Sequence, residues 1–533
     1  MHPGVAGSAP GPQALPVEGL APSSPAPAPT ASPGILDGIL RAAVVLDAPS
    51  LPGAPPAPGS AAEFLREASP WRALALWLGP SALHLKTRRA LLQALDRDIA
   101  RIDGILSKQV NAILHHPRFQ GLEAAWRGIR YLVDQAEDAE DVKIKVLNAS
   151  WKELAKDAER AVEFDQSQMF RKIYSEEFGT PGGEPFGVLL GDYGIRHRPG
   201  PDHPIDDLEV LASISQVAAA AFAPFIAGAA PELFGLESFS QLERPIQLAR
   251  IFEQPEYIKW KAFRETEDSR FTGLTLPRIL LRLPYGNDGS RDDGFLFKED
   301  VEGPDRSKYL WGNAAFAFGA VLVRAYRQSG WLAEIRGVRR DEESNGLVTG
   351  LPVHSFGTDR QGIAPKSSTD LIVGDAQEKE LGDLGLIPLC HCPDTEYCAF
   401  YGNQSLQKPK VYNELPATMN ARISAMLQYM LCVSRFAHYL KIRMQSKIGS
   451  FAEAREVEDD LNRWIHDYVA PDAEASASVK AKYPLREAQI QVAERPGKPG
   501  NYMCVMHLLP HYQLDAVTAT VTLRTEMGPM QGR

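Results

Sequence analysis

The best candidate for a metal site in this sequence is a short group of thiols with one imidazole. Cys390, His391 and Cys392 are consecutive, and Cys398 follows six residues later. Thiolate and imidazole are the natural ligands of zinc. The spacing is unfavourable, however, because adjacent residues of a strand point to opposite faces of a sheet, and structural zinc sites usually use two pairs of closely spaced ligands. We therefore expect no metal ion and no other cofactor.

A second group of residues could supply a nucleophile and a base. Ser434, Arg435 and His438 fall within one predicted helix. Their neighbours are largely apolar, and polar residues in such a helix are more often hydrogen-bonded core groups than catalysts. The sequence also lacks the G-x-x-x-x-G-K-[ST], G-x-S-x-G and H-E-x-x-H motifs. We therefore expect a protein that is not an enzyme.

The charge balance and the cysteine content narrow the class of protein further. The 533 residues include 57 Lys and Arg against 67 Asp and Glu, a net charge of −10 without a long basic cluster, so we expect no nucleic-acid partner. Five cysteines are an odd and sparse set, which favours a reducing compartment. The longest near-apolar run, residues 217–230, is shorter than the roughly 20 residues that span a bilayer. These features predict a cytoplasmic protein without membrane insertion.

The first 60 residues differ in composition from the rest of the chain. They carry 14 of the 41 prolines and only four charged residues, a composition that cannot bury enough surface to offset the entropy of ordering. We predict a disordered tail over residues 1–33, a short amphipathic helix over 34–46 and a linker over 47–80. The apolar face of this helix would consist of Ile35, Leu36, Ile39, Leu40 and Val44. Such a helix could dock on a partner or pack back on its own chain.

Residues 81–137 carry a helical pattern in two parts. The first part has apolar residues at alternating steps of three and four, which is a heptad seam. The seam consists of Leu92, Leu95, Ile99, Ile102 and Leu106. The segment His115-His116-Pro117 ends this helix, and a second apolar stripe follows on Leu122, Trp126, Ile129 and Val133. The pattern predicts a helical hairpin whose apolar stripe packs on the chain's own core or on another subunit.

The remainder of the chain mixes the apolar period of helices, about 3.6 residues, with the period of strands, about two residues. Alternation over residues 142–146 and short apolar runs at 186–191, 274–283 and 384–389 predict strands, and residues 208–223, 309–331 and 417–447 predict helices. Residues 138–480 are therefore expected to form an α/β body, of mixed α+β character. Residues 481–533 are expected to be C-terminal strands, the last of which alternates strictly. Its apolar side would consist of Val517, Ala519, Val521 and Leu523. Such a strand could lie at the edge of its own sheet or join the sheet of a neighbouring subunit.

Several long segments resemble one known family. They are residues 113–128, 186–193, 309–316, 378–385, 403–409, 428–438 and 483–488. In this order they are similar to the large sheath subunit of the type VI secretion system, the TssC/VipB family, and the likeness extends over about residues 80–530. The resemblance implies a contractile-sheath fold and a structural, force-transmitting role.

The resemblance also implies partners. A subunit of this family pairs with a small sheath subunit, stacks into a helical tube around an inner tube above a baseplate, and contracts to drive the inner tube outward. The seam of Leu92 to Leu106 would contact the small subunit, and the strand of Val517 to Leu523 would complete a sheet shared with neighbouring sheath subunits. The helix at residues 34–46 would be recognised by an ATP-driven unfoldase that recycles contracted sheath, although Gly38 stands where the family commonly has an acidic residue.

Two alternatives remain at this stage. One is the sheath protein of another phage-tail-like injection system. The other, from a different class, is a cytoplasmic metal-dependent enzyme that uses Cys390, His391 and Cys392.

Overall fold

The structure is a computed structural model, and its description covers most of the chain after the N-terminal tract. The described residues are 64–78, 87–137, 141–286, 294–338, 345–354, 367–447, 454–494, 502–511 and 521–527, except 65, 181, 296, 303–304, 393–394, 471 and 473. The predicted tail at 1–33 and the predicted helix at 34–46 lie outside these residues. The predicted linker at 47–80 contains a helix in its described part, α3 (Pro70–Leu78).

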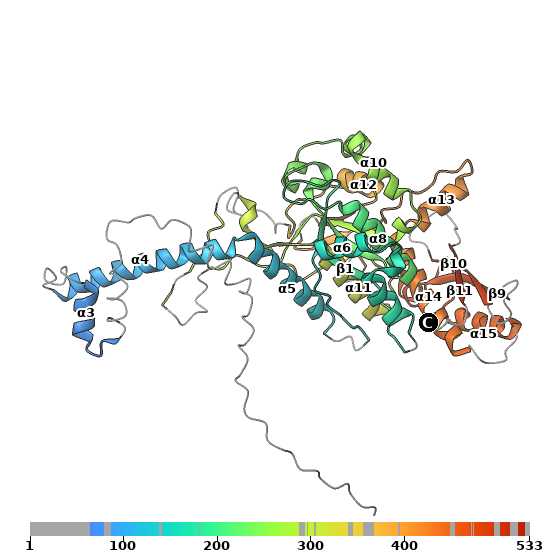
Figure 1. Ribbon diagram of the computed structural model, residues 1–533, viewed down its shortest axis with the longest axis horizontal. Helices are drawn as coiled ribbons and strands as arrows, with labels where there is room; N and C mark the ends of the chain where they lie inside the picture. The colour runs from blue at the N-terminus through green and yellow to red at the C-terminus, as the bar shows by residue number, and fades with distance from the viewer. Residues whose placement is uncertain are drawn as a thin grey trace, which may run out of the picture.

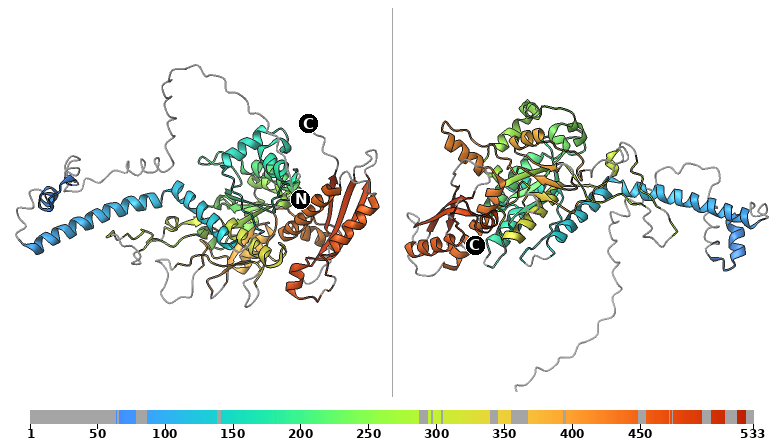
Figure 2. Two further views of the ribbon diagram at one scale, coloured as in Figure 1. Left: turned by 90° about the horizontal axis from the view of Figure 1, so that it is seen from below. Right: turned by 180° about the vertical axis from the view of Figure 1, so that it is seen from behind.

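Two helices, α4 and α5, follow α3. We call α3 together with α4 the arm, and we call the bend between α4 and α5 the elbow. The long helix α4 (Arg88–Leu114) projects from the body and carries α3 at its far end (Figures 1 and 2). It begins at Thr87, whose side chain accepts a hydrogen bond from the Ala90 amide at 3.2 Å, as an N-cap does. After a two-residue link, α5 (Pro117–Gln135) starts with proline at its first position, where the missing N–H costs nothing.

The two helices do not fold back on each other, so the predicted hairpin is wrong. In Figures 1 and 2, α5 continues onto the body at an angle to α4. The reason is that α5 packs on α11 (Ala314–Ser329), about 190 residues later in the chain. The approach is close: a Cβ atom at Gly128 would lie 2.4 Å from ring carbons of Phe316. The apolar period of the segment predicted a packed helix correctly but could not name its partner.

A six-stranded sheet forms the centre of the body, in the order β1-β2-β3-β7-β8-β6. The first four strands are parallel neighbours, β8 pairs antiparallel with β7, and β6 pairs antiparallel with β8. The bounds are β1 (Leu189–Ile195), β2 (Phe225–Ala229), β3 (Thr272–Leu276), β7 (Ile387–His391), β8 (Cys398–Phe400) and β6 (Leu347–Val348). A short pair, β4 (Ile279–Leu280) and β5 (Trp311–Gly312), lies beside it. The predicted α/β class is confirmed.

Helices cover both faces of this sheet, as the side-chain alternation of a strand requires. Phe225 and Ala227 of β2 face a core shared with α8, whereas Ile226 between them faces a core shared with α11 and α5. The helices of the first core include α6 (Trp151–Arg160), α8 (Asp207–Ala221), α9 (Leu248–Glu253), α10 (Ile258–Arg264) and α12 (Asp375–Asp383). Short helical turns connect several of them, among them α7 (Gln168–Phe170) and a π-helical segment at Arg171–Phe178.

The third core belongs to the C-terminal part of the chain. The helix predicted over residues 417–447 is two helices, α13 (Leu415–Ser424) and α14 (Leu427–Lys447). Their successors are α15 (Ala454–His466), α16 (Ala477–Lys482), β9 (Leu485–Glu494), β10 (Tyr502–Pro510) and β11 (Val521–Met527). Side chains of α14, α15, β9 and β10 share one cluster around Phe436. The C-terminal strands therefore belong to a unit that begins well before residue 481.

Among the helices in the described ranges, none is long and apolar enough to cross a bilayer. The strand predicted over residues 142–146 does not form: this stretch carries no ladder partner in the described part of the chain.

Candidate assembly surfaces and the joint of the arm

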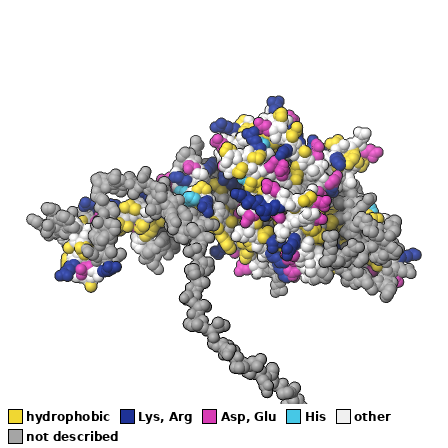
Figure 3. Space-filling view, in the orientation of Figure 1, with side chains coloured by type: hydrophobic (Ala, Val, Ile, Leu, Met, Phe, Trp, Pro, Cys, Tyr) yellow, Lys and Arg dark blue, Asp and Glu magenta, His cyan; other side chains and the backbone are white. Residues whose placement is uncertain are grey.

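The seam of α4 lies on the projecting arm, and α3 covers only part of it. Leu92 and Ile99 are 48% and 54% exposed, and Leu106 is also exposed. Leu95 and Ile102 are half-buried, because α3 packs over this stretch of α4. Trp77 of α3 fixes that contact with a hydrogen bond from Nε1 to Asp98 Oδ2 at 3.0 Å. Hydrophobic side chains are visible along the arm in Figure 3. The arm thus presents an apolar surface that the described part of its own chain leaves open.

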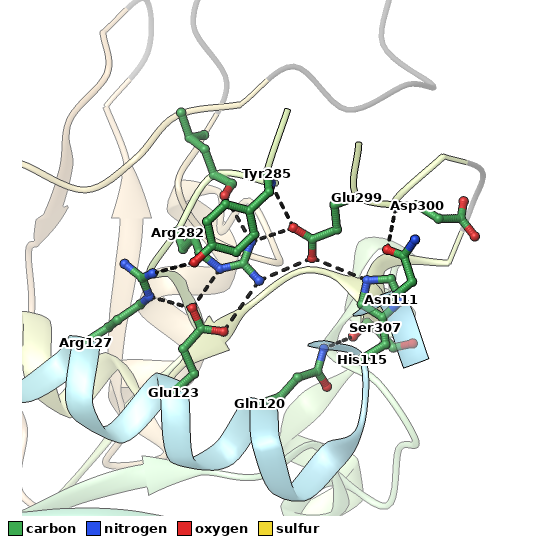
Figure 4. Close-up of polar contacts among 11 residues, drawn as sticks. Asn111, His115, Gln120, Glu123, Arg127, Arg282, Tyr285, Glu299, Asp300 and Ser307 are labelled. Atoms are coloured by element: carbon green, nitrogen blue, oxygen red, sulfur yellow. Dashed lines mark hydrogen bonds and ion pairs between the residues drawn. The ribbon is translucent and has the colours of Figure 1, made fainter. Parts of the chain in front are cut away.

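A buried ion-pair cluster holds the base of this arm to the body, and we call it the joint (Figure 4). At its centre the Arg282 guanidinium donates to Glu299 through Nη1 at 2.6 Å and to Glu123 of α5 through Nε at 2.9 Å. Arg127 of α5 also donates to Glu123, at 2.7 Å, and to the Tyr285 hydroxyl at 3.1 Å. The planar guanidinium of Arg282 suits two carboxylates at once, because its donors form a rigid fork.

The joint extends to the last turn of α4. His115 Nε2 lies 3.3 Å from Glu299 Oε1, and the Asn111 side-chain oxygen accepts the Asp300 amide at 2.9 Å. On α5, Gln120 donates to the Ser307 carbonyl at 3.1 Å. Both helices are therefore tied to the same segment, residues 282–307, on either side of the elbow (Figure 4). A set of contacts on both sides of a bend fixes its angle.

At Glu299, burial and ion pairing shift the pKa of the carboxyl in opposite directions. Burial alone raises the pKa of this carboxyl, but the hydrogen bonds from Arg282 and from the Tyr285 amide outweigh it and hold the pKa below its usual value. Glu299 is therefore ionised at neutral pH, and the joint works as a charged network. Sequence reasoning missed it. The available signal was Arg282 itself, a charged residue inside the apolar run of residues 279–283.

The second candidate surface is the edge strand of the C-terminal sheet. Strand β11 pairs antiparallel with β10 of the same chain, with Val521 opposite Leu508 and Leu523 opposite Met506. The order β11-β10-β9 leaves β11 at an edge of this sheet. Val517 and Ala519 lie outside the described residues. An edge strand presents a row of backbone groups to which another chain can add.

Comparison with known protein families shows the family to which this chain belongs. A model described as VipB, the EvpB/VC_A0108 tail sheath N-terminal domain, matches residues 96–407. A second model, the tail sheath gpW/gp25-like domain of the same family, matches residues 416–527. The chain belongs to the EvpB/VC_A0108 tail sheath family. The junction between the two matches falls just before α13, so the first covers the central sheet and the second the C-terminal unit.

A named relative of this tail sheath protein is similar over most of its length. The type VI secretion system sheath protein TssC1 of Pseudomonas aeruginosa strain PAO1 is 43% identical over 439 residues, which are 82% of this chain and 86% of the relative. Among solved structures, a sheath tail protein from Desulfitobacterium hafniense matches 60% of this chain and 60% of its own, with 7% identity and a TM-score of 0.27.

The thiols of this tail sheath protein are buried structural groups. Cys390 lies on β7, and Cys398 starts β8 in register with His391. Burial raises the pKa of the Cys390 thiol to about 12 and that of Cys398 to about 11, so both are protonated at neutral pH. Zinc binds the thiolate form. Within the ranges given above, no group of three His, Cys, Asp or Glu side chains is placed to hold a metal ion.

Ser434, Arg435 and His438 do not form a nucleophile and base in this tail sheath protein. His438 Nε2 donates to the Ala221 carbonyl at 2.9 Å, and Ser434 is buried. The Arg435 guanidinium lies over the rings of Tyr326 and Tyr439. His438 and Arg435 therefore serve separate contacts of α14, and the buried Ser434 hydroxyl has no hydrogen-bond partner in the described part of the chain.

Proposed function

We propose that this chain is the large structural subunit of a type VI secretion sheath and that it is not an enzyme. With a small sheath subunit it polymerises in the cytoplasm around an inner tube, and the polymer contracts from a baseplate to drive that tube out of the cell. The membership of the tail sheath family carries the proposal, and the similarity to a type VI secretion sheath protein favours this system over other phage-tail-like injection systems.

The arm is the proposed contact with the small sheath subunit. Leu92, Ile99 and Leu106 support this role because they are exposed apolar residues on one long helix. The joint supports it too, since a rigid base is what positions a projecting helix for a partner. Leu95 and Ile102 would contribute at the margin of α3.

The C-terminal edge is the proposed contact between neighbouring sheath subunits. The edge position of β11 and the alternation of Val517, Ala519, Val521 and Leu523 support strand addition between chains. Many weak contacts of this kind, changing together along stacked rings, would store the energy of contraction. The helix predicted at residues 34–46 is the proposed recognition element for an ATP-driven recycling unfoldase.

Co-expression with the small sheath subunit tests the proposal. We expect the two chains to co-purify and to form hollow tubes in electron micrographs. Metal-dependent turnover by the purified chain, or tubes that form equally well without the small subunit, would contradict the proposal.

A further inference from the structure

The tryptophan that follows α11 packs in a core that belongs to another part of the chain. Trp331 lies two residues after the end of α11, inside the segment that the N-terminal family model matches. Its side chain nevertheless belongs to the third core, together with side chains of α14, α15, β9 and β10. The ring stacks on Phe436 with 4.4 Å between the ring centroids, and Trp331 is only 5% exposed. One large side chain thus anchors the end of α11 in the C-terminal unit.

The end of α11 fixes the backbone of this tryptophan. The helix stops at Gly330, whose φ of 75° lies in the left-handed region that glycine adopts without strain. The Gly330 amide donates to the Tyr326 carbonyl at 2.7 Å. The Trp331 amide donates to the Ser329 hydroxyl at 3.2 Å, and this hydroxyl lies 2.9 Å from the Ala325 carbonyl. These contacts tie the backbone of Trp331 to the last turn of α11.

A cation of α14 holds the same end of α11. The Arg435 guanidinium lies over the rings of Tyr326 and Trp331, at 4.7 Å and 5.8 Å from the ring centroids. It also lies over Tyr439 of its own helix, at 5.1 Å, and Nη2 donates to the hydroxyls of both tyrosines. The described part of the chain gives this guanidinium no carboxylate partner, so the faces of the rings take the place of a counter-ion. We call four side chains the clasp: Tyr326, Trp331, Arg435 and Tyr439.

Helix α11 also supports the helix that carries the arm. Near its beginning, Phe316 of α11 fills the space beside Gly128 of α5. Near its end, Arg327 donates from Nη1 to the carbonyl of Gln135, the last residue of α5, at 3.1 Å. The joint then holds α5 and the end of α4 to one segment of the body. The arm and the C-terminal unit are therefore both fixed to α11, the arm through α5 and the C-terminal unit through the clasp.

We infer that the clasp locks the C-terminal unit to α11 and thereby fixes the orientation of the C-terminal sheet relative to the arm. The inference rests on the proposed function in one respect, since the arm and the edge of β11 are the two proposed contacts with other chains. A closed clasp presents these two contacts at one fixed angle. An open clasp leaves the central sheet and the C-terminal sheet folded, but the angle between the two contacts varies.

Hydrogen exchange tests whether Arg435 holds the clasp. Trp331 is a core residue in its own right, so the test changes the cation, which is only partly buried. In Arg435→Met, the amides of residues 330–332 should exchange about tenfold faster, because a cation–π contact is lost. Arg435→Lys keeps a cation and should restore most of the protection. Arg443→Met is the matched control, because the Arg443 guanidinium lies over Trp464 inside the C-terminal unit, 5.1 Å from the ring centroid. Unchanged exchange in Arg435→Met, or an equal increase in Arg443→Met, would overturn the inference.

Distances between spin labels test whether the clasp fixes the orientation of the C-terminal unit. The five native cysteines are buried, so labels would attach to cysteines introduced at exposed positions. Suitable positions are Arg130 of α5 and Arg463 of α15, whose side chains are exposed. The chain with Arg435 should give one narrow distance distribution, Arg435→Met a broad one, and Arg435→Lys a narrow one again.

Both measurements use the full chain, together with the small subunit where the two co-purify. A distance distribution in Arg435→Met as narrow as in the wild type would contradict the inference, because the clasp would then be local packing only. A failure of the chain to form tubes would instead count against the proposed function and not against the clasp.

Discussion

Arg282 and Glu299 form an ion pair at 2.6 Å although their side chains are only 6% and 1% exposed. Pairs of this kind are costly to bury, and removal of one partner leaves the other as an uncompensated buried charge. Here the pair is shared with Glu123 of α5, and its neighbour His115 is the residue that caps the end of α4. We therefore interpret the joint as the element that fixes the arm to the body.

Removing Glu299 should loosen the elbow. Breaking a buried pair costs about 3–5 kcal/mol, and since Glu123 still pairs with Arg282 in Glu299→Gln, we expect the lower part of that range. The free energy of unfolding in urea measures the total loss of stability. Faster hydrogen exchange in the last turn of α4 would show that the loss occurs at the elbow.

A neighbouring exposed pair supplies the control. Lys298 and Glu302 interact at 2.5 Å with both side chains more than 70% exposed, and such exposed pairs contribute little to stability because water and salt screen them. Lys298→Gln should therefore change stability little. Similar losses in the two variants would mean that burial of the joint has no special role.

His438 should make the fold sensitive to mild acid. Burial lowers the pKa of this imidazole to about 4 despite its hydrogen bond to Ala221, whereas the unfolded chain titrates near 6.5. The unfolded state therefore binds the proton first, so stability is full above pH 6.5 and falls as the pH drops towards 4, by about 3 kcal/mol for this group. Unfolding free energies at pH 7, 6 and 5 should show this fall. His438→Gln should have a shallower pH dependence; an unchanged slope would assign the effect to other groups.

The sequence predicted the central elements but not their connections. The apolar runs at 208–223 and 384–389 correspond to α8 and β7, because burial on several sides leaves a local record in the sequence. The joint leaves almost no such local record, since Arg282 pairs with Glu123, a residue that lies 159 positions away in the sequence. The alternation at 142–146 predicted a strand, and this segment has no strand partner among the residues that the structure describes. A local pattern reports that a face will be covered, and it cannot report by what.

Val521→Asp should abolish assembly while the central sheet remains folded. Val521 stands opposite Leu508 in the edge strand β11, so the substitution places a charge in the strand proposed to join subunits. Thr522→Asp, at the next position of the strand and in register with His507, is the matched control and should assemble. Electron microscopy of co-expressed subunits provides the measurement. Normal sheaths assembled from the Val521→Asp variant would contradict the proposed sheet shared between subunits.

Deletion of residues 34–46 should separate contraction from recycling. The apolar face of Ile35, Leu36, Ile39, Leu40 and Val44 is the proposed unfoldase contact, and we expect the tube to assemble without it. We expect sheaths that assemble and contract but persist when the unfoldase and ATP are added, as turbidity would record. Disassembly at the wild-type rate would refute this assignment.

Sedimentation velocity of the chain with and without the small sheath subunit tests the central claim most directly. The account holds that the arm and the edge of β11 are completed by other chains. It therefore predicts self-association or precipitation of the chain alone, and a defined hetero-complex that grows into tubes when the small subunit is present. A compact, monodisperse monomer that stays soluble and ignores the small subunit would contradict it.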